Sequence, residues 1–280
     1  MAKHRLVTLA CLALLTFATL RAQDADVPAF EAASIKETDH ATPVRAGADR
    51  FVRSYITLVQ LMIYAHEISD FQIEGGPDWV RTRRYDVEAK ADRSRPASEM
   101  RLMVRRLLTE RFNLKTHVET RERPRYALVT TRDDKRLGPK LKPSAFDCPA
   151  IVAARGPDFK LPSGPPQPGE PPRCGIVARL GGGSRTLMAE GQPMSAIAKM
   201  FQSLAGRVIV DKTGLPGTFD IEVETEILEL GDLPPNTFGE PKEGLSLSTA
   251  LREQLGLKLE SERGPVDLLV IDSVDRPTPN

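Results

Sequence analysis

The sequence predicts an α+β protein built from two tandem βαββαββ units, and a repeated motif is the first reason for this prediction. The stretches GGPDWVRTRRYDVEAKA (75–91) and TGLPGTFDIEVETE (213–226) both place Gly and Pro before an aromatic residue, Asp, an aliphatic residue and Glu. A helical pattern precedes each copy, and a second helical pattern follows it. Such self-similarity along a chain indicates repeated structural units.

The helices are predicted from apolar residues that recur at helical spacing. Both of the downstream helices stop at a residue that tolerates a left-handed backbone, Asn113 or Gly256, immediately before Leu-Lys. This agreement extends the similarity beyond the motif itself. The four stretches are TLVQLMIYAHEI (57–68), SEMRLMVRRLLTERFNLK (98–115), PMSAIAKMFQSL (193–204) and LSTALREQLGLK (247–258).

The strands are predicted from alternation and from short extended segments. In the first copy of the motif Tyr85, Val87 and Ala89 alternate with charged residues, and the second copy alternates in the same way. A period of two with one apolar face predicts a half-buried strand. Further strands are expected at 53–55, 71–74, 116–120 and 126–131, and at 186–189, 207–210, 259–262 and 268–272, with FEAASIKE (30–37) as a candidate additional strand.

Residues 1–22 have the layout of a secretory signal peptide. A basic start is followed by an apolar run from Leu6 to Leu20 and by the small residue Ala22. The run has about 15 residues, fewer than the roughly 20 that span a bilayer, so we favour cleavage near Ala22 over a retained membrane anchor. No later segment is apolar enough to cross a membrane. The mature chain is therefore expected in the periplasm or outside the cell.

The predicted organisation is a signal peptide (1–22), a basic first unit (23–142), a Pro-rich linker (143–185) and an acidic second unit (186–280). Nine prolines lie among the 31 residues from Pro143 to Arg173, a composition that argues against helix and central strand. Cys148 and Cys174 are the cysteines of the mature chain. An even number of cysteines in an exported chain predicts a disulfide, and two unpaired thiols are the alternative.

The two predicted units differ in charge. Residues 51–142 contain 20 Lys and Arg against 13 Asp and Glu, whereas residues 186–276 contain 8 against 16. The units could attract each other, these could be ordinary solvated faces, or the first unit could present a basic docking surface to an acidic protein, an anionic glycan or a lipid headgroup. Nucleic acid is disfavoured, because no aromatic residues alternate with the basic ones. The candidate binding residues are Arg81, Arg83, Arg84, Arg105, Arg106 and Trp79.

No catalytic or metal-binding motif stands out, and no cofactor is expected. His40, His66 and His117 share no metal-ligand spacing, and HEISD (66–70) is not the HExxH zinc motif. The sequence KTG at 212–214 lacks the accompanying motifs of penicillin-recognising enzymes, so we interpret it as a turn.

The paired carboxylates of the repeated motif are a further catalytic candidate. Asp86 with Glu88, and Asp220 with Glu222, could serve glycoside hydrolysis. Because each pair has a period of two on an amphipathic strand, we interpret the four side chains as a solvated face.

Six stretches carry a resemblance to a known family: FEAASIKE, GGPDWVRTRRYDVEAKA, LLTERFNLKTHVETRERPRYALV, VIVDKTGLPGTFDIEVE, LREQLGLKLE and LLVIDSVDRP. Together they resemble a large secreted family of unknown function that is expanded in soil Acidobacteria and named after Solibacter. Some members of that family are fused to membrane metallopeptidase sensors, which implies sensing rather than catalysis. A helix is followed by GRVIVD, a strand with alternating charge, SLSTALREQLGLKLE and LLVID. This pattern is similar to the short N-terminal modules of secretins and TonB-dependent receptors, which bind other proteins in the periplasm. This resemblance implies a type of module and no catalytic residues.

We therefore expect an exported, non-catalytic binding or sensing module whose partner is an envelope or extracellular protein. Binding would use exposed sheet edges, by strand addition, or the Arg-rich face of the first unit. The alternatives are a secreted hydrolase whose active site lies outside known motifs, and a structural envelope protein.

Overall fold

The structure is a computed structural model that describes residues 28–44, 47, 49–155, 174–181, 184–226 and 246–277. The predicted signal peptide, and most of the prolines of the predicted linker, lie outside these residues. None of the helices in the described ranges is both long and apolar enough to cross a membrane.

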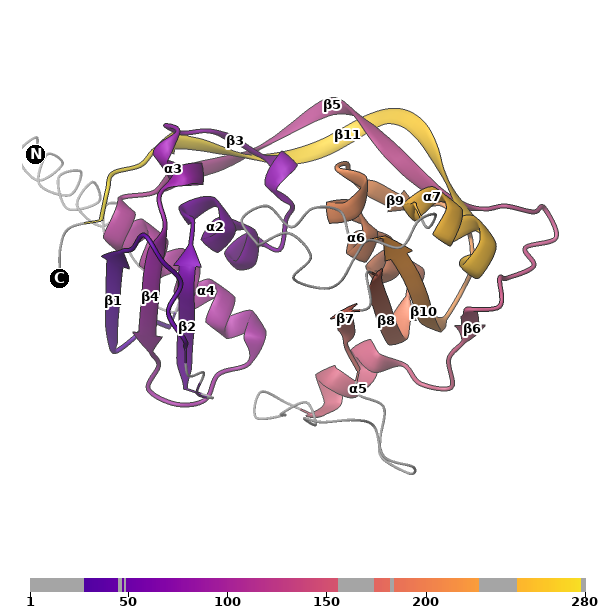
Figure 1. Ribbon diagram of the computed structural model, residues 1–280, viewed down its shortest axis with the longest axis horizontal. Helices are drawn as coiled ribbons and strands as arrows, with labels where there is room; N and C mark the ends of the chain where they lie inside the picture. Colours follow the sequence, from indigo (N-terminus) through magenta and orange to yellow (C-terminus); the bar gives the residue numbers. More distant parts are fainter. Residues whose placement is uncertain are drawn as a thin grey trace, which may run out of the picture. The chain divides into compact units, whose positions relative to one another are not determined.

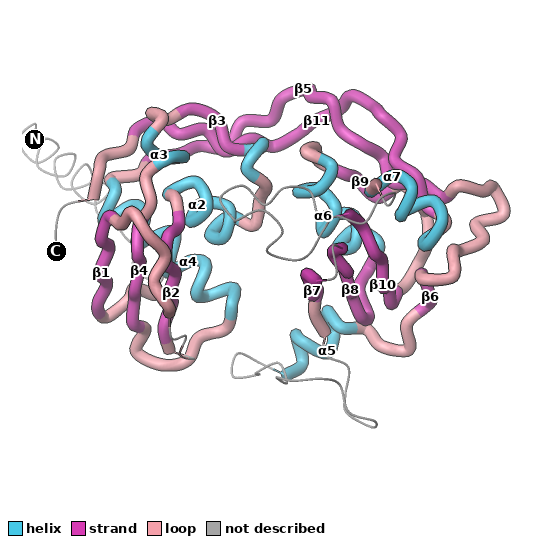
Figure 2. Tube along the Cα trace, viewed as in Figure 1, coloured by secondary structure: helices cyan, strands magenta, loops and turns pink. Residues whose placement is uncertain are grey.

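The chain is a mixed α+β protein, as the sequence predicts, and the strands within the described residues form three sheets (Figures 1 and 2). The strand orders are β1-β4-β2, β6-β10-β8-β7 and β3-β11-β5-β9. The elements in chain order are β1 (Ala32–Glu37), β2 (Arg50–Ile56), α2 (Leu58–His66), η2 (Asp70–Gln72), β3 (Ile73–Gly75), α3 (Trp79–Thr82), β4 (Tyr85–Lys90), α4 (Ala97–Phe112), β5 (Lys115–Thr130), β6 (Leu141–Pro143), α5 (Cys148–Arg155), β7 (Ile176–Gly181), β8 (Ser184–Pro193), α6 (Met194–Ala205), β9 (Ile209–Asp211), β10 (Thr218–Glu226), α7 (Leu247–Ala250), η3 (Leu251–Leu255) and β11 (Leu257–Ser273).

The chain divides into two compact units that do not follow its order. Unit 1 comprises Met1–His66, Asp78–Leu114 and Val274–Asn280, and unit 2 comprises Glu67–Pro77 and Lys115–Ser273. The segment around β3 therefore belongs to unit 2, although it lies between two helices of unit 1.

Unit 1 places helices α2 and α4 together beside the β1-β4-β2 sheet. Tyr85, Val87 and Ala89 of β4 are buried and Glu88 is exposed, so the alternation predicted from the sequence is confirmed. The ring of Tyr85 meets that of Phe112 on α4 edge-on, with 5.5 Å between centroids. The candidate strand at 30–37 is also confirmed, because β1 pairs antiparallel with β4.

Unit 2 has a core built from α6, η3 and the inner faces of β8 and β10. Phe201, Phe219 and Leu255 are buried in it together with Leu128 from the second half of β5. The helix predicted at 247–258 is a short α-helix, α7, followed by a π-helical turn, η3. It ends at Gly256, which has φ 70°, just as α4 ends at Asn113, which has φ 45°. Both predicted left-handed helix ends are confirmed.

The extended segments expected at 116–120 and 126–131 form one long strand, β5, and those at 259–262 and 268–272 form β11. The two strands pair antiparallel over their whole length, from Lys115 opposite Ser273 to Thr130 opposite Leu257. Pro124 and Pro265 do not break them, because β3 and β9 pair only with Leu269–Ile271 and Tyr126–Leu128 respectively. Each proline thus stands where its strand has one partner, and its missing N–H can face the open edge.

The prediction that the prolines exclude helix from 143–173 is wrong. Helix α5 forms from Cys148 to Arg155 within this segment. Pro149 lies in its first turn, where the missing N–H has no intrahelical acceptor to lose. The next proline of the sequence is Pro157, so the helix has room for two turns before it.

Candidate functional site

Two matched β-bulges determine the geometry of the candidate site. In unit 1 the β2–β4 register shifts between Arg53 and Ile56, and Tyr55 in the shift has φ 57°. Its backbone N–H donates to Asp86 Oδ1 at 3.0 Å. In unit 2 the N–H of Gly191, with φ 58°, donates in the same way to Asp220 Oδ1 at 2.8 Å. The repeated Asp therefore holds a bulge at the point where a strand leads into a helix.

These contacts correct the interpretation of all four motif carboxylates as a solvated face. Glu88 and Glu222 are exposed, but Asp86 and Asp220 are half-buried and hydrogen-bonded. Partial burial opposes ionisation of Asp86, yet hydrogen bonds from Ser54, Tyr55 and Thr42 outweigh it and hold the pKa of this carboxyl below its usual value. The ionised Asp86 carboxylate therefore accepts the hydrogen bond from the backbone N–H of the bulge.

The Tyr55 side chain lies at an open pocket of about 580 Å³, which we call the Tyr55 pocket. Arg84 also lines this pocket. Its guanidinium lies 4.7 Å from the Tyr55 ring centroid, and its Nη1 donates to Tyr55 O at 3.3 Å. Tyr55 and Arg84 are both half-buried. The further lining includes Glu37, Asp39, His40 and Arg83.

Charged side chains that line the Tyr55 pocket form ion pairs with one another. Arg83 Nη1 donates to Glu37 Oε1 at 2.6 Å, and His40 Nδ1 lies 2.6 Å from Asp39 Oδ1. The hydrogen bond with His40 lowers the pKa of Asp39. Lining residues thus include two guanidinium groups and two carboxylates, so the pocket is far less basic than its arginines alone suggest.

The structure brings only part of the predicted Arg-rich site together. Arg83 and Arg84 line the Tyr55 pocket, and Arg81 and the half-buried Trp79 lie on α3, the short helix just before them. Arg105 instead donates from Nε to the carbonyl of Ala65 at 2.7 Å and so ties α4 to α2. On α4, Arg106 forms a 2.7 Å ion pair with Glu110.

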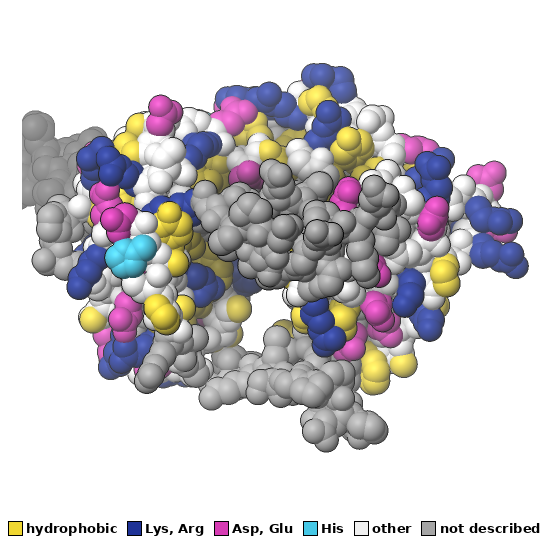
Figure 3. Space-filling model, in the orientation of Figure 1, with side chains coloured by type: hydrophobic (Ala, Val, Ile, Leu, Met, Phe, Trp, Pro, Cys, Tyr) yellow, Lys and Arg dark blue, Asp and Glu magenta, His cyan; other side chains and the backbone are white. Residues whose placement is uncertain are grey.

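Much of the basic surface of unit 1 is neutralised locally. Arg50 pairs with Glu88, and Arg95 pairs with Asp92 at 2.9 Å and with Glu99 at 2.7 Å. On the face drawn in Figure 3, Lys and Arg side chains are interspersed with Asp and Glu side chains. An exposed ion pair adds little stability, but it reduces the field that would steer an acidic partner.

The histidines occupy three different environments. Burial, with Arg105 nearby, lowers the pKa of His66 to about 4. His117 on β5 has Nδ1 2.8 Å from Asp272 Oδ1 on β11, and both side chains are about half exposed. Among the residues whose placement the structure gives, no three His, Cys, Asp or Glu side chains gather to hold a metal ion.

The sequence KTG at 212–214 forms a turn, as interpreted from the sequence. The backbone N–H and hydroxyl of Thr213 both donate to Asp211 Oδ1, at 2.9 and 2.7 Å. Gly214 follows with φ 60°. The threonine hydroxyl therefore serves the backbone of this turn.

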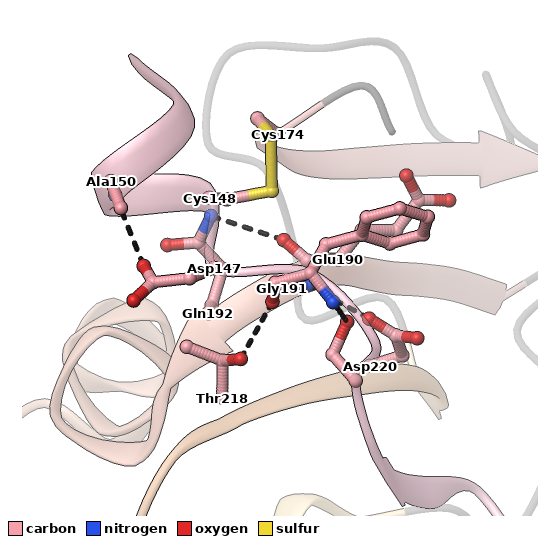
Figure 4. Close-up of a disulfide and its surroundings, with 11 residues drawn as sticks. Asp147, Cys148, Ala150, Cys174, Glu190, Gly191, Gln192, Thr218 and Asp220 are labelled. Atoms are coloured by element: carbon pink, nitrogen blue, oxygen red, sulfur yellow. Dashed lines mark hydrogen bonds between the residues drawn. A yellow bond between two sulfur atoms is a disulfide. The ribbon is translucent and has the colours of Figure 1, made fainter. Parts of the chain in front are cut away.

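The predicted disulfide between Cys148 and Cys174 is present and joins α5 to the start of β7 (Figure 4). It lies against Gly191, where an added Cβ would come within 2.7 Å of Cys148 Sγ and 2.9 Å of Phe146 O. Thr218 donates its hydroxyl to the same Phe146 carbonyl at 2.6 Å. In unit 2, the surroundings of the bulge are thus closed by the chain itself.

Strand β7 forms one end of the β6-β10-β8-β7 sheet and pairs antiparallel with β8. Its other edge has no strand partner in the described part of the chain. Ile176 and Val177 are each 45% exposed. An open strand edge with exposed apolar side chains is a place where an extended peptide can add as a further strand.

A family model described as "Protein of unknown function (DUF3738)" matches residues 59–274. The chain belongs to this family. The match begins in α2 and ends just after β11, so it includes both bulge aspartates, the Tyr55 pocket arginines and β7. No curated protein and no solved structure matches the chain.

Sequence reasoning did not identify Tyr55 or β7. A signal for Tyr55 existed, because aligning the two copies of the motif places Tyr55 opposite Gly191, both ahead of the helix that follows. A bulky residue opposite a glycine in a repeat suggests a backbone that favours glycine. For β7, the stretch IVARLG was assigned to the linker.

Proposed function

We propose that the chain is an exported, non-catalytic binding module that adds an extended segment of a partner protein to the open edge of β7. The observation that carries this proposal is the exposure of Ile176 and Val177 on an edge strand. In strand addition, backbone hydrogen bonds supply affinity, and side-chain contacts on both faces supply specificity.

Several other sheet edges support the choice of β7, because they carry features that discourage pairing. Strand β6 has only three residues and ends at Pro143. On β1, the side chain of Arg111 donates to the carbonyl of Ala33 at 3.1 Å. The open edges of β5 and β11 are lined with charged residues. Proteins use such features to prevent unwanted strand pairing at sheet edges. Strand β7, by contrast, carries a single charged residue, Arg179.

Export is proposed from the predicted signal peptide together with the Cys148–Cys174 disulfide. Disulfides persist in the periplasm and outside the cell, where the reducing systems of the cytosol do not act. A binding role also agrees with the sequence resemblance to the periplasmic modules of secretins and TonB-dependent receptors.

We further propose that the two halves of the chain are copies of one fold that have exchanged their last strand. Thr38 N–H donates to Arg84 O at 3.0 Å at the end of β1, as Ser144 N–H donates to Thr218 O at 2.8 Å at the end of β6. Strand β3 of the first half pairs with β11, and β9 of the second half pairs with β5. These matched contacts support a common origin of the two halves.

The test of the binding proposal is affinity capture from envelope and secreted fractions, with residues 23–280 as bait. We expect a protein partner that is lost when Ile176 and Val177 are both changed to lysine, because charges on an edge strand prevent pairing. The matched control is Val152→Lys, which charges a residue of α5 that is 47% exposed. Equal capture by the double variant and wild type would contradict the proposal.

An empty capture would also contradict it, and screens with hydrolase substrates would then be required. Charge reversal at the five candidate arginines, Arg81, Arg83, Arg84, Arg105 and Arg106, would be a poor control, because Arg105 holds α4 to Ala65. Reversal at that position would disturb the fold of unit 1 as well as its surface.

A further inference from the structure

Strands β7 and β8 each carry one arginine, Arg179 and Arg185. Arg179 is exposed and Arg185 is half-buried. Neither side chain forms a hydrogen bond or an ion pair with any residue whose placement the structure gives. On β5, by contrast, Arg125 pairs with Glu262 at 2.8 Å. The guanidinium groups of Arg179 and Arg185 therefore keep their N–H groups available to another molecule.

Arg185 is partly desolvated without compensation from a carboxylate. Burial lowers its pKa from the ordinary value of an arginine, and no acidic side chain among the described residues opposes that effect. Withdrawing a charge from water is unfavourable unless the charge is paired. A carboxylate from another chain would therefore gain more by pairing with Arg185 than with an arginine on a fully exposed surface.

The two arginines lie on opposite faces of the sheet. Arg179 stands opposite Thr186, and its neighbour Leu180 stands opposite Arg185. Because successive residues of a strand point to opposite faces, Leu180 and Arg185 share one face and Arg179 lies on the other. Leu187, two residues after Arg185, is buried in the core of unit 2. Arg185 is therefore on the core face, and Arg179 is on the outer face.

The open edge of β7 changes in character along its length. Ile176, Val177 and Ala178 are apolar and exposed, and Arg179 and Leu180 follow them. A residue that an added strand places beside Arg179 shares its face. A residue placed beside Leu180 would lie two strand spacings, about 10 Å, from the backbone of Arg185, a gap that a glutamate and an arginine side chain span together.

The acidic character of the second half limits how many negative charges the segment can carry. Residues 186–276 contain 16 Asp and Glu against 8 Lys and Arg. Their combined field repels a uniformly acidic segment. Strand β7 has no acidic residue of its own, so carboxylates placed beside Arg179 and Leu180 meet arginines.

We propose that the segment that adds to β7 carries two adjacent acidic residues next to three apolar ones, with the acidic pair beside Arg179 and Leu180. This inference rests on the proposed function and names the chemistry of its partner. One carboxylate binds Arg179 on the outer face, and the other binds Arg185 on the core face. In an antiparallel addition the acidic pair precedes the apolar residues, and in a parallel addition it follows them.

The test is an NMR titration of residues 23–280 with four pentapeptides, all acetylated at the N-terminus and amidated at the C-terminus. Two are Glu-Glu-Val-Ile-Val and Val-Ile-Val-Glu-Glu, and the other two replace both Glu by Gln. We expect one Glu peptide to shift the amide signals of Ile176–Leu180 saturably, with a Kd at least about tenfold below that of its Gln counterpart. The order that binds gives the direction of the added strand.

Two variants and one control accompany the titration. Arg185→Gln should raise the Kd of the Glu peptide at least about fivefold, and Arg179→Gln should raise it less, because an exposed ion pair is weaker. Neither should change the Kd of the Gln peptide. Arg252→Gln removes an exposed arginine of η3 and should bind like wild type. Since Arg185→Gln removes a partly desolvated charge, it should fold at least as well as wild type.

Two results would each overturn the acidic pair while leaving strand addition in place. They are Glu and Gln peptides that shift the β7 signals with equal Kd, and a Glu-peptide Kd that stays within about twofold of wild type in both arginine variants. If none of the four peptides shifts these signals, the open edge of β7 does not accept a strand, and the proposed function is contradicted together with this inference.

Discussion

At the residue scale, Gly191 combines two constraints, a left-handed backbone and a close steric contact. Its φ of 58° favours glycine, and a Cβ at this position would meet Cys148 Sγ at 2.7 Å and Phe146 O at 2.9 Å. Gly206 has a similar φ of 64°, but a Cβ there would meet nothing within 4 Å. Comparing a side chain added at Gly191 with one added at Gly206 therefore separates the energetic cost of the left-handed backbone from the cost of steric contact.

We expect Gly191→Ala to destabilise the protein more than Gly206→Ala does. The second substitution should cost about 1 kcal/mol of unfolding free energy, the usual penalty of a left-handed alanine. The first adds displacement of the disulfide and should cost at least about 2 kcal/mol. Urea unfolding of both variants measures the difference, and equal midpoints would show that the disulfide segment moves aside freely.

His66 provides a pH-dependent contribution to stability. Burial and the nearby Arg105 lower its pKa in the folded protein from 6.5 to about 4, so the unfolded chain binds the proton more readily. The stability contributed by the neutral side chain is therefore complete above pH 6.5 and is lost as the pH falls towards 4. We expect His66→Gln to lose less unfolding free energy than wild type between pH 7 and pH 4.5. Identical pH profiles in urea unfolding would contradict this account.

At the element scale, the β5–β11 ribbon connects segments from distant parts of the chain. Strand β3 pairs with residues 269–271 of β11, and Gln72 donates its side-chain amide to the carbonyl of Asp267 at 3.0 Å. Beyond the strand, Asp275 N–H donates to Phe112 O at 2.7 Å at the end of α4. The last residues of the chain thus complete structure that begins in its first half.

Deletion of β11 tests this exchange. We expect a chain ending at Gly256 to lose hydrogen-exchange protection at Ile73–Gly75 as well as in β5, because β11 is the strand that pairs with both. A chain ending at Pro277 retains β11 and serves as the control. Protection of β3 that survived the deletion would show that the first half completes its own sheet.

At the scale of the whole molecule, local patterns predicted the α+β class, both left-handed helix ends and the amphipathic strand β4. Local patterns do not predict the pairing partner of a strand. The sequence pattern of an extended segment is the same whether it pairs with a neighbouring strand or with a strand from the other half of the chain. Helix α5 is not predicted by the proline content, because a proline disrupts a helix in its interior, whereas Pro149 lies in the first turn.

The candidate site could be predicted only in part, because it too depends on the pairing of strands. Arg83 and Arg84 stand out as neighbours in the sequence, whereas Tyr55 reaches them through a register shift between β2 and β4. Arg105 and Arg106 share the same composition, yet they serve α4 and its contact with α2. Charge alone does not distinguish an arginine that binds a carbonyl of its own protein from one that lines a pocket.

The pairing of β3 with β11 also orders events during synthesis. Gln72 and Asp267 are 195 positions apart, so this contact cannot form until the chain has been made as far as Asp267. Closing so long a loop carries a large entropic cost, and proteins dominated by such non-local pairing fold slowly. A newly made chain therefore leaves β3 without its partner strand until the C-terminal segment arrives, and its final structure is gained late.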